Sequence, residues 1–166
     1  MIKIYLLFFL TAFIPITGFG QKHSIFVDGD INFDNSYLSI TEAGMDYTTT
    51  NPSEGTLQLS VLYTLKPENN PNYNWRVSVH VQNLEWNESL KIKIRRTGSG
   101  RNKNNSGNPK IYDGLVYQPV SNTPIPFFKG KGEIIEIPVS VTISGYSVIM
   151  GAGESESSLI FTVYDD

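Results

Sequence analysis

The sequence contains no cysteine and only two histidines, His23 and His80. Without cysteine, the chain has no disulfide, no thiolate metal site, no cysteine nucleophile and no cysteine for lipid attachment. Two histidines are too few for a multi-histidine zinc site. A domain of this size can be held together by a hydrophobic core alone, so disulfides are dispensable even in an exported protein. We therefore expect neither a cofactor nor a zinc site.

The first 20 residues have the composition of a secretory signal peptide. Lys3 begins a short positive region, residues 4–14 are almost wholly apolar, and Gly18 and Gly20 supply the small residues of a cleavage site. The segment is too short and wrongly flanked for a membrane anchor. Removal of 20 of the 166 residues leaves 146, and the loss of Lys3 changes the net charge from −3 to −4. We expect one domain at 21–166, exported to the periplasm, the cell surface or the extracellular medium, with no transmembrane segment and with His23 in a frayed N-terminus.

Apolar and polar side chains alternate with a period of two in several segments, which is typical of half-buried strands. The clearest runs cover residues 57–63, 75–81, 90–95, 135–143 and 159–164. Turn-forming residues are concentrated between them, at 66–74, 98–109 and 151–158. No segment of the mature chain shows helical periodicity. The pattern predicts an all-β protein with a single immunoglobulin-like antiparallel β-sandwich, and Trp75 lies on the apolar phase of its run.

Pro138 lies inside the longest of these runs. Proline cannot donate a hydrogen bond to a neighbouring strand. This position therefore indicates an edge strand, a bulge or a strand that switches sheets.

The segment after the predicted cleavage site places apolar residues or glycine at every second position. These residues are Ile25, Val27, Gly29, Ile31 and Phe33. The segment resembles the N-terminal donor strand of chaperone–usher pilins, which implies assembly with other copies or other surface proteins through strand pairing. The alternative is a first strand that pairs within its own sandwich. Both interpretations stay open at the level of the sequence.

Polar residues of the same segment are spaced like the start of a calcium loop, at Asp28, Asp30 and Asn32. Counted from Asp28, however, the sixth position is Phe33 rather than glycine, and the twelfth is Ser39 rather than glutamate. The three residues would equally form the polar face of a strand. The sequence does not decide whether calcium binds here.

Several short segments resemble a group of small, secreted bacterial β-sandwich proteins. They are residues 40–47, 75–80, 95–100, 127–132 and 143–148. The run 159–164 is similar to the last strand of spore-coat-U-type and fimbrial subunits. No activity is assigned to that group. The resemblance implies a secreted sandwich and favours a role in surface structures or adhesion.

Positive charge is concentrated between residues 91 and 103, where no acidic residue occurs. This basic patch comprises Lys91, Lys93, Arg95, Arg96, Arg101 and Lys103. It could bind an anionic glycan or an acidic partner surface, or it could keep a solvent-facing strand soluble and unpaired. Nucleic acid is not expected, because no aromatic–basic stacking motif accompanies the patch.

Two aromatic residues in or near predicted loops, Tyr73 and Trp86, could stack on sugar rings. No G-x-S-x-G nucleophile motif is present, and no pair of carboxylates is singled out, so we do not expect an enzyme. The sequence favours a secreted or cell-surface structural or interaction module, of which a fimbrial- or coat-like subunit is one form. The alternative is a glycan-binding module that uses loop aromatics and the basic strand.

Overall fold

The computed structural model describes most of the predicted domain. The described residues are 22–29, 31, 53–64, 73–85, 89–103, 108–145 and 156–166. Within these ranges the chain forms ten strands and no helix, so none of the described segments could cross a membrane as a helix. The predicted signal peptide, Asp30, Asn32, Phe33 and Trp86 lie outside the described residues.

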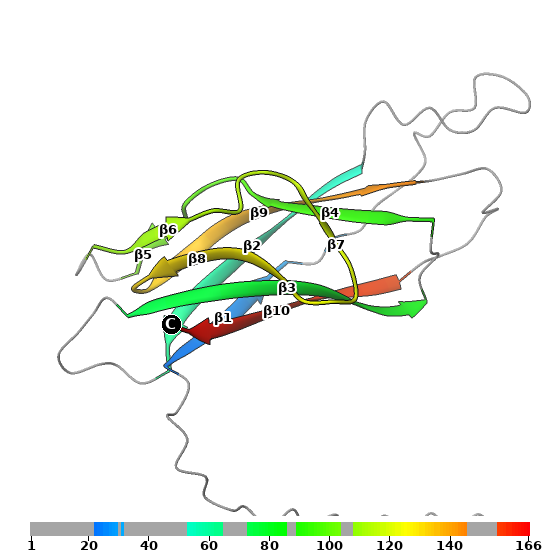
Figure 1. Cartoon of the computed structure of the whole chain (residues 1–166). Coiled ribbons are helices and arrows are strands. Elements are labelled where there is room, and N and C mark those ends of the chain that lie inside the picture. Colours follow the sequence, from blue (N-terminus) through cyan, green and yellow to red (C-terminus); the bar gives the residue numbers. More distant parts are fainter. Residues whose placement is uncertain are drawn as a thin grey trace, which may run out of the picture.

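The strands form two antiparallel sheets that pack face to face (Figure 1). In sheet A the order is β1 (His23–Asp28), β2 (Ser53–Tyr63), β9 (Ile134–Ser144), β4 (Lys91–Arg96) and β7 (Gln118–Val120), and β5 (Arg101–Asn102) also pairs with β9. In sheet B the order is β10 (Glu156–Asp165), β3 (Asn74–Glu85), β8 (Ile125–Lys131) and β6 (Lys110–Tyr112). The predicted all-β antiparallel sandwich is confirmed, and its immunoglobulin-like character stays a prediction.

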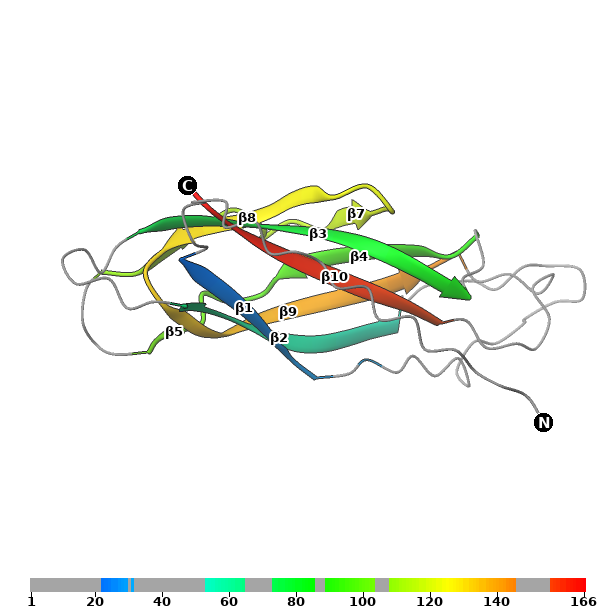
Figure 2. The same ribbon diagram turned by 90° about the horizontal axis from the view of Figure 1, so that it is seen from below.

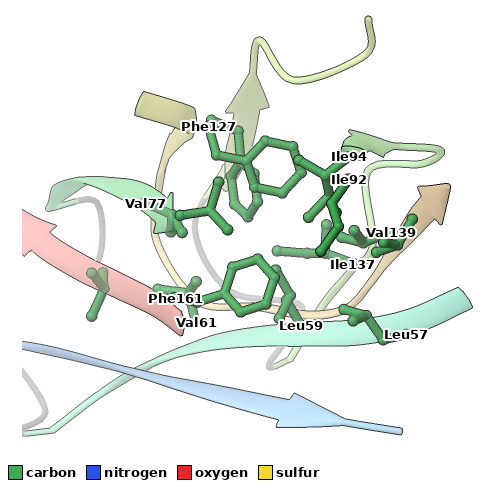
Figure 3. Packing of buried hydrophobic residues seen from close by; sticks show 14 of the residues in the cluster. Leu57, Leu59, Val61, Val77, Ile92, Ile94, Phe127, Ile137, Val139 and Phe161 are labelled. Carbon is green, nitrogen blue, oxygen red and sulfur yellow. The ribbon is translucent and has the colours of Figure 1, made fainter. Parts of the chain in front are cut away.

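The core lies between the sheets and is built from the apolar phase of each alternating run (Figure 3). Leu59 of β2 and Ile137 of β9 are completely buried, and so is Trp75 of β3. The Trp75 indole Nε1 donates a hydrogen bond to the carbonyl oxygen of Gly132 at 2.7 Å, which satisfies the one polar atom of this ring. The predicted inward orientation of Trp75 is therefore confirmed.

Pro138 lies in β9, which is a central strand of sheet A. The register of β9 against β2 shifts between Leu59 and Val61, and Glu136 adopts a φ of 55° beside the shift. On its other side, the Pro138 carbonyl accepts the Thr97 amide at 2.9 Å, just beyond the end of β4. Of the three explanations for this proline, a bulge next to it is the one that the structure contains.

β1 is one edge strand of sheet A and β10 is one edge strand of sheet B, and they lie beside each other on one side of the sandwich (Figure 2). The N-terminal end of β1 meets the C-terminal end of β10 there (Figure 2). The start of β1 in sheet A and the end of β10 in sheet B are thus close together. This side contains the segment that the sequence marks as a possible assembly strand.

Candidate functional site: the edge strand β1

β1 pairs along its whole length with β2 of the same chain. Ile25 is opposite Val61, and Val27 is opposite Leu59. Beyond the last paired residue, Ile31 still lies against β2. Its side chain fills the space next to Gly55, so a Cβ atom on residue 55 would collide with Ile31. Gly29 has a φ of 108°, a conformation that favours glycine. The described part of the predicted assembly strand therefore lies on its own sandwich.

The outer side of β1 is the free edge of sheet A. The Thr64 amide donates to the Lys22 carbonyl at 2.8 Å, so the hydrogen-bonded positions of the antiparallel ladder continue at Ser24 and Phe26. The backbone amides and carbonyls of Ile25 and Val27 consequently point away from β2. They form a row of groups to which another strand could pair.

Apolar side chains stand beside this edge. Phe26 is 56% exposed and Val27 is 49% exposed, although Ile25 and Ile31 pack partly against the core. Large apolar side chains at neighbouring exposed positions of an edge strand are the kind of surface that binds a partner or aggregates. Of the predicted assembly residues, Ile25 and Ile31 are thus partly buried against the core and Val27 is exposed, whereas Phe26 is an exposed residue that the sequence prediction did not include.

β1 lacks the features that protect two other edges of the sandwich. β7 and β6 each contain three residues, and they carry Pro119 and Lys110 respectively. β1 contains six residues, with no proline, lysine or arginine among them. Short length, lysine and proline are the usual means of preventing edge-to-edge pairing. β1 is therefore open to strand addition.

A partly buried polar pair connects the start of β1 to the end of β10. His23 is completely buried, and its Nδ1 donates to Asp165 Oδ1 at 2.5 Å. The backbone amide of Lys22 donates to Asp165 Oδ2, also at 2.5 Å. The His23 ring packs against Tyr63, with ring centroids 4.9 Å apart. The expectation that His23 lies in a frayed terminus is therefore wrong, because Asp165 and the ring of Tyr63 hold it in place.

The surroundings of Asp165 favour its ionised form, which is the form that accepts hydrogen bonds. Partial burial raises the pKa of its carboxyl group, but the hydrogen bonds from Lys22 and His23 outweigh this effect and hold the pKa below 3.8, its ordinary value. Sequence reasoning missed the pair, because its members are 142 positions apart and neither belongs to a recognisable motif. The pair keeps β1 seated while leaving its outer edge open.

The six residues of the basic patch do not form one surface. Lys91 and Lys93 are exposed on the outer face of β4, and no ion pair joins them to an acidic residue of the described ranges. Arg101 forms an ion pair with Glu136, and Lys103 Nζ lies 3.5 Å from Glu133 Oε1. With Arg95, which lies near Glu54, three of the six charges are therefore opposed by carboxylates.

Arg95 belongs to a polar cluster on the outer face of sheet A. Its guanidinium lies 4.4 Å from the centroid of the Tyr117 ring and 4.0 Å from Glu54 Oε1. Glu54 also accepts hydrogen bonds from Ser140 Oγ and from Tyr117 Oη. These bonds, that from Ser140 first, lower the pKa of Glu54. Arg95 is thus part of a cross-strand network that joins three strands of sheet A, β2, β9 and β4, to Tyr117, the residue before β7.

Arg96 is buried and only 4% exposed. Its Nε and Nη2 both donate to the carbonyl of Asp113, at 3.0 and 2.8 Å, and its Nη1 donates to the carbonyl of Gly98 at 2.7 Å. Burial lowers the pKa of the guanidinium. Arg96 fixes the loop between β6 and β7, and it is not part of an exposed surface.

The two loop aromatics named from the sequence give little support to a sugar site. Tyr73 is half-buried, with its ring 6.5 Å from that of Tyr63 and with Lys22 Nζ 4.2 Å from its centroid. Trp86 lies outside the described residues. Of the predicted calcium ligands, Asp28 alone is described, exposed at the end of β1. Across the described ranges, no three histidine or acidic side chains gather as a metal site would require.

No protein-family model, curated protein or solved structure matches this chain. The resemblance to secreted bacterial sandwich proteins and to fimbrial subunits therefore stays a prediction.

Proposed function

We propose that this protein is an exported, non-catalytic interaction module of the cell surface, which assembles with other copies of itself through the edge strand β1. One observation carries the proposal. β1 is a six-residue edge that lacks proline and lysine, and it displays Phe26 and Val27 beside its outward backbone groups. Export is supported by the composition of the first 20 residues.

Strand addition suits this edge because it combines two kinds of contact. The outward amides and carbonyls of Ile25 and Val27 supply backbone hydrogen bonds to an incoming strand. The exposed side chains of Phe26 and Val27 supply apolar area that the incoming strand would cover. A β1 edge can pair with the β1 edge of a second copy in antiparallel fashion, which gives a symmetric dimer.

The assembly differs from donor-strand exchange. β1 already completes its own sandwich, and the pair formed by His23 and Asp165 holds it there. We therefore propose that strands are added to a complete domain. A fimbrial- or coat-like assembly would then be built from dimers of complete sandwiches joined edge to edge.

The test compares two variants with the same chemical change. Val27→Lys places a charge on the edge, where it should block strand addition. Val116→Lys makes the same change at a residue of the β6–β7 loop that is 80% exposed and far from β1 in the sequence. Mature protein, residues 21–166, is measured by light scattering over a range of concentrations.

We expect a dimer for the mature protein and for Val116→Lys, and a monomer for Val27→Lys. A monomer for the unchanged protein at every concentration would refute the proposal. Oligomers that persist in Val27→Lys would place the interface elsewhere and would refute the role of β1.

A further inference from the structure

The outer face of sheet B carries a cluster of cations that no motif in the sequence indicates. Lys110 of β6 is directly opposite Lys131 of β8, and Arg76 of β3 is directly opposite Lys129 of β8. Residues that are directly opposite in an antiparallel pair project from the same face of the sheet. Four cationic side chains therefore stand together on three adjacent strands.

This arrangement costs stability in the free protein. Like charges directly opposite each other in neighbouring strands repel, and the face contains two such pairs side by side. Two carboxylates offset part of the charge, since Asp166 lies 3.5 Å from Arg76 and Asp113 lies 3.3 Å from Lys129. Both ion pairs are exposed, and such pairs exchange readily for other partners. Positive charge is thus in local excess here although the protein is net acidic, and a bound anion would reduce the repulsion among these cations.

Two tyrosines flank the cations in the same register. The row across the sheet runs from Tyr164 through Arg76 and Lys129 to Tyr112. Tyr112 is 45% exposed and Tyr164 is 41% exposed, with the Arg76 guanidinium 5.4 Å from the centroid of the Tyr164 ring. Because neighbouring strands lie about 4.8 Å apart, the row is about 14 Å long. This length accommodates a short oligosaccharide.

The surface continues past β6 into an open groove of about 550 Å³. Lys110 and Tyr112 form part of its wall, together with Arg101, Asn102 and Asn108. A ligand that crosses sheet B would therefore not have to end at the edge of the sheet. Its next unit would enter a groove lined by amide and cationic side chains, which suit sugar hydroxyls and acidic groups, and by the apolar side chains of Ile111 and Ile134.

We infer that this face binds an acidic, uronate-containing polysaccharide, laid across the strands between Tyr164 and Tyr112. The cations would bind the carboxylates, and the tyrosine rings would pack against the apolar faces of the sugar rings. Charge complementarity selects an anion. The side chains of the row are cations and tyrosines, with no aliphatic group that could insert into a lipid bilayer. This site shares only Arg101 of the groove with the sequence-predicted residues, which are Tyr73, Trp86 and the basic patch, and it is independent of assembly through β1.

The binding test uses calorimetric titration of the mature protein with oligogalacturonate, and with a neutral malto-oligosaccharide as control ligand. Lys110→Gln combined with Lys131→Gln should weaken binding about tenfold, since it removes two of the four cations. The matched control is Lys91→Gln combined with Lys93→Gln, which removes the same charge from the outer face of sheet A. Binding in that control should stay within about twofold of the unchanged protein, as expected for distant charges screened by salt.

Tyr112→Leu should also weaken binding, and Tyr112→Phe should retain it, because the ring is the proposed contact. Without ligand, Lys110→Gln with Lys131→Gln should unfold at a higher temperature in low salt, because a like-charge pair has been removed. That result would separate lost binding from lost folding.

Several outcomes would overturn the inference. They are no binding of oligogalacturonate, equal binding of the neutral ligand, and equal weakening by both double variants. Binding restricted to single-stranded DNA or to anionic lipid vesicles would also overturn it, in favour of that other class of partner.

Discussion

Replacement of Arg96 by methionine tests whether this residue holds the fold together. The change keeps most of the side-chain volume and removes three hydrogen bonds of 3.0 Å or less to the carbonyls of Asp113 and Gly98. A fully buried acceptor that loses its partner costs about 1–3 kcal/mol, and the two carbonyls affected here make partly buried hydrogen bonds. The relief of guanidinium desolvation offsets part of this cost, so we expect a loss of about 2–4 kcal/mol.

The assay is urea unfolding followed by tryptophan fluorescence, with Arg101→Met as the matched control. Arg101 forms its ion pair with Glu136 on the exposed surface, where solvent screens the interaction, so its replacement should change stability much less. The Arg96→Met midpoint should fall while the m-value stays constant. Arg96→Lys should be intermediate, because one ammonium group cannot reproduce the planar fork. Equal stabilities of Arg96→Met and Arg101→Met would refute the structural role.

Three further predictions concern packing and pH. Gly130→Ala should destabilise the domain by about 1–3 kcal/mol in thermal unfolding, because the new Cβ would lie 2.5 Å from the Trp75 ring; unchanged stability would contradict the packing. Asp165→Asn should be less stable than the unchanged protein at pH 7. The difference should shrink as pH falls below about 4, because a carboxyl group whose pKa is lowered by folding stabilises the protein only while it is ionised. A difference in stability that stays constant with pH would refute the coupling to ionisation. Tyr117→Phe should raise the pKa of Glu54 in an NMR titration, and Thr56→Ser, a neighbouring control, should leave it unchanged.

Much of the fold was predictable from alternation alone. The runs at 75–81 and 135–143 correspond to parts of β3 and β9, and their apolar phases form part of the core, except for Ile135, in whose place Ile134 is buried. Period two reports which side of a strand faces the interior, so it predicts strands and burial well. It gives no information on strand order or register, which depend on contacts between distant segments.

The basic patch shows how this limit affects site prediction. Arg96 shares the inward phase of Ile92 and Ile94, so alternation already contained the signal that it is buried. Its charge suggested an exposed position instead. The cations of sheet B could not have been found in this way, because Arg76, Lys110 and Lys131 come together only through the register of three strands. The pair of His23 and Asp165 was hidden for the same reason.

Assembly through β1 is tested most directly by hydrogen exchange of single amides, followed by NMR at increasing protein concentration. The amides of Ile25 and Val27 point to the free edge, whereas those of Ser24 and Phe26 are paired with β2. We predict that Ile25 and Val27 exchange fast in dilute protein and become protected as concentration rises, while Ser24 and Phe26 are protected throughout. Fast exchange of Ile25 and Val27 at every concentration would contradict the proposed edge-to-edge assembly.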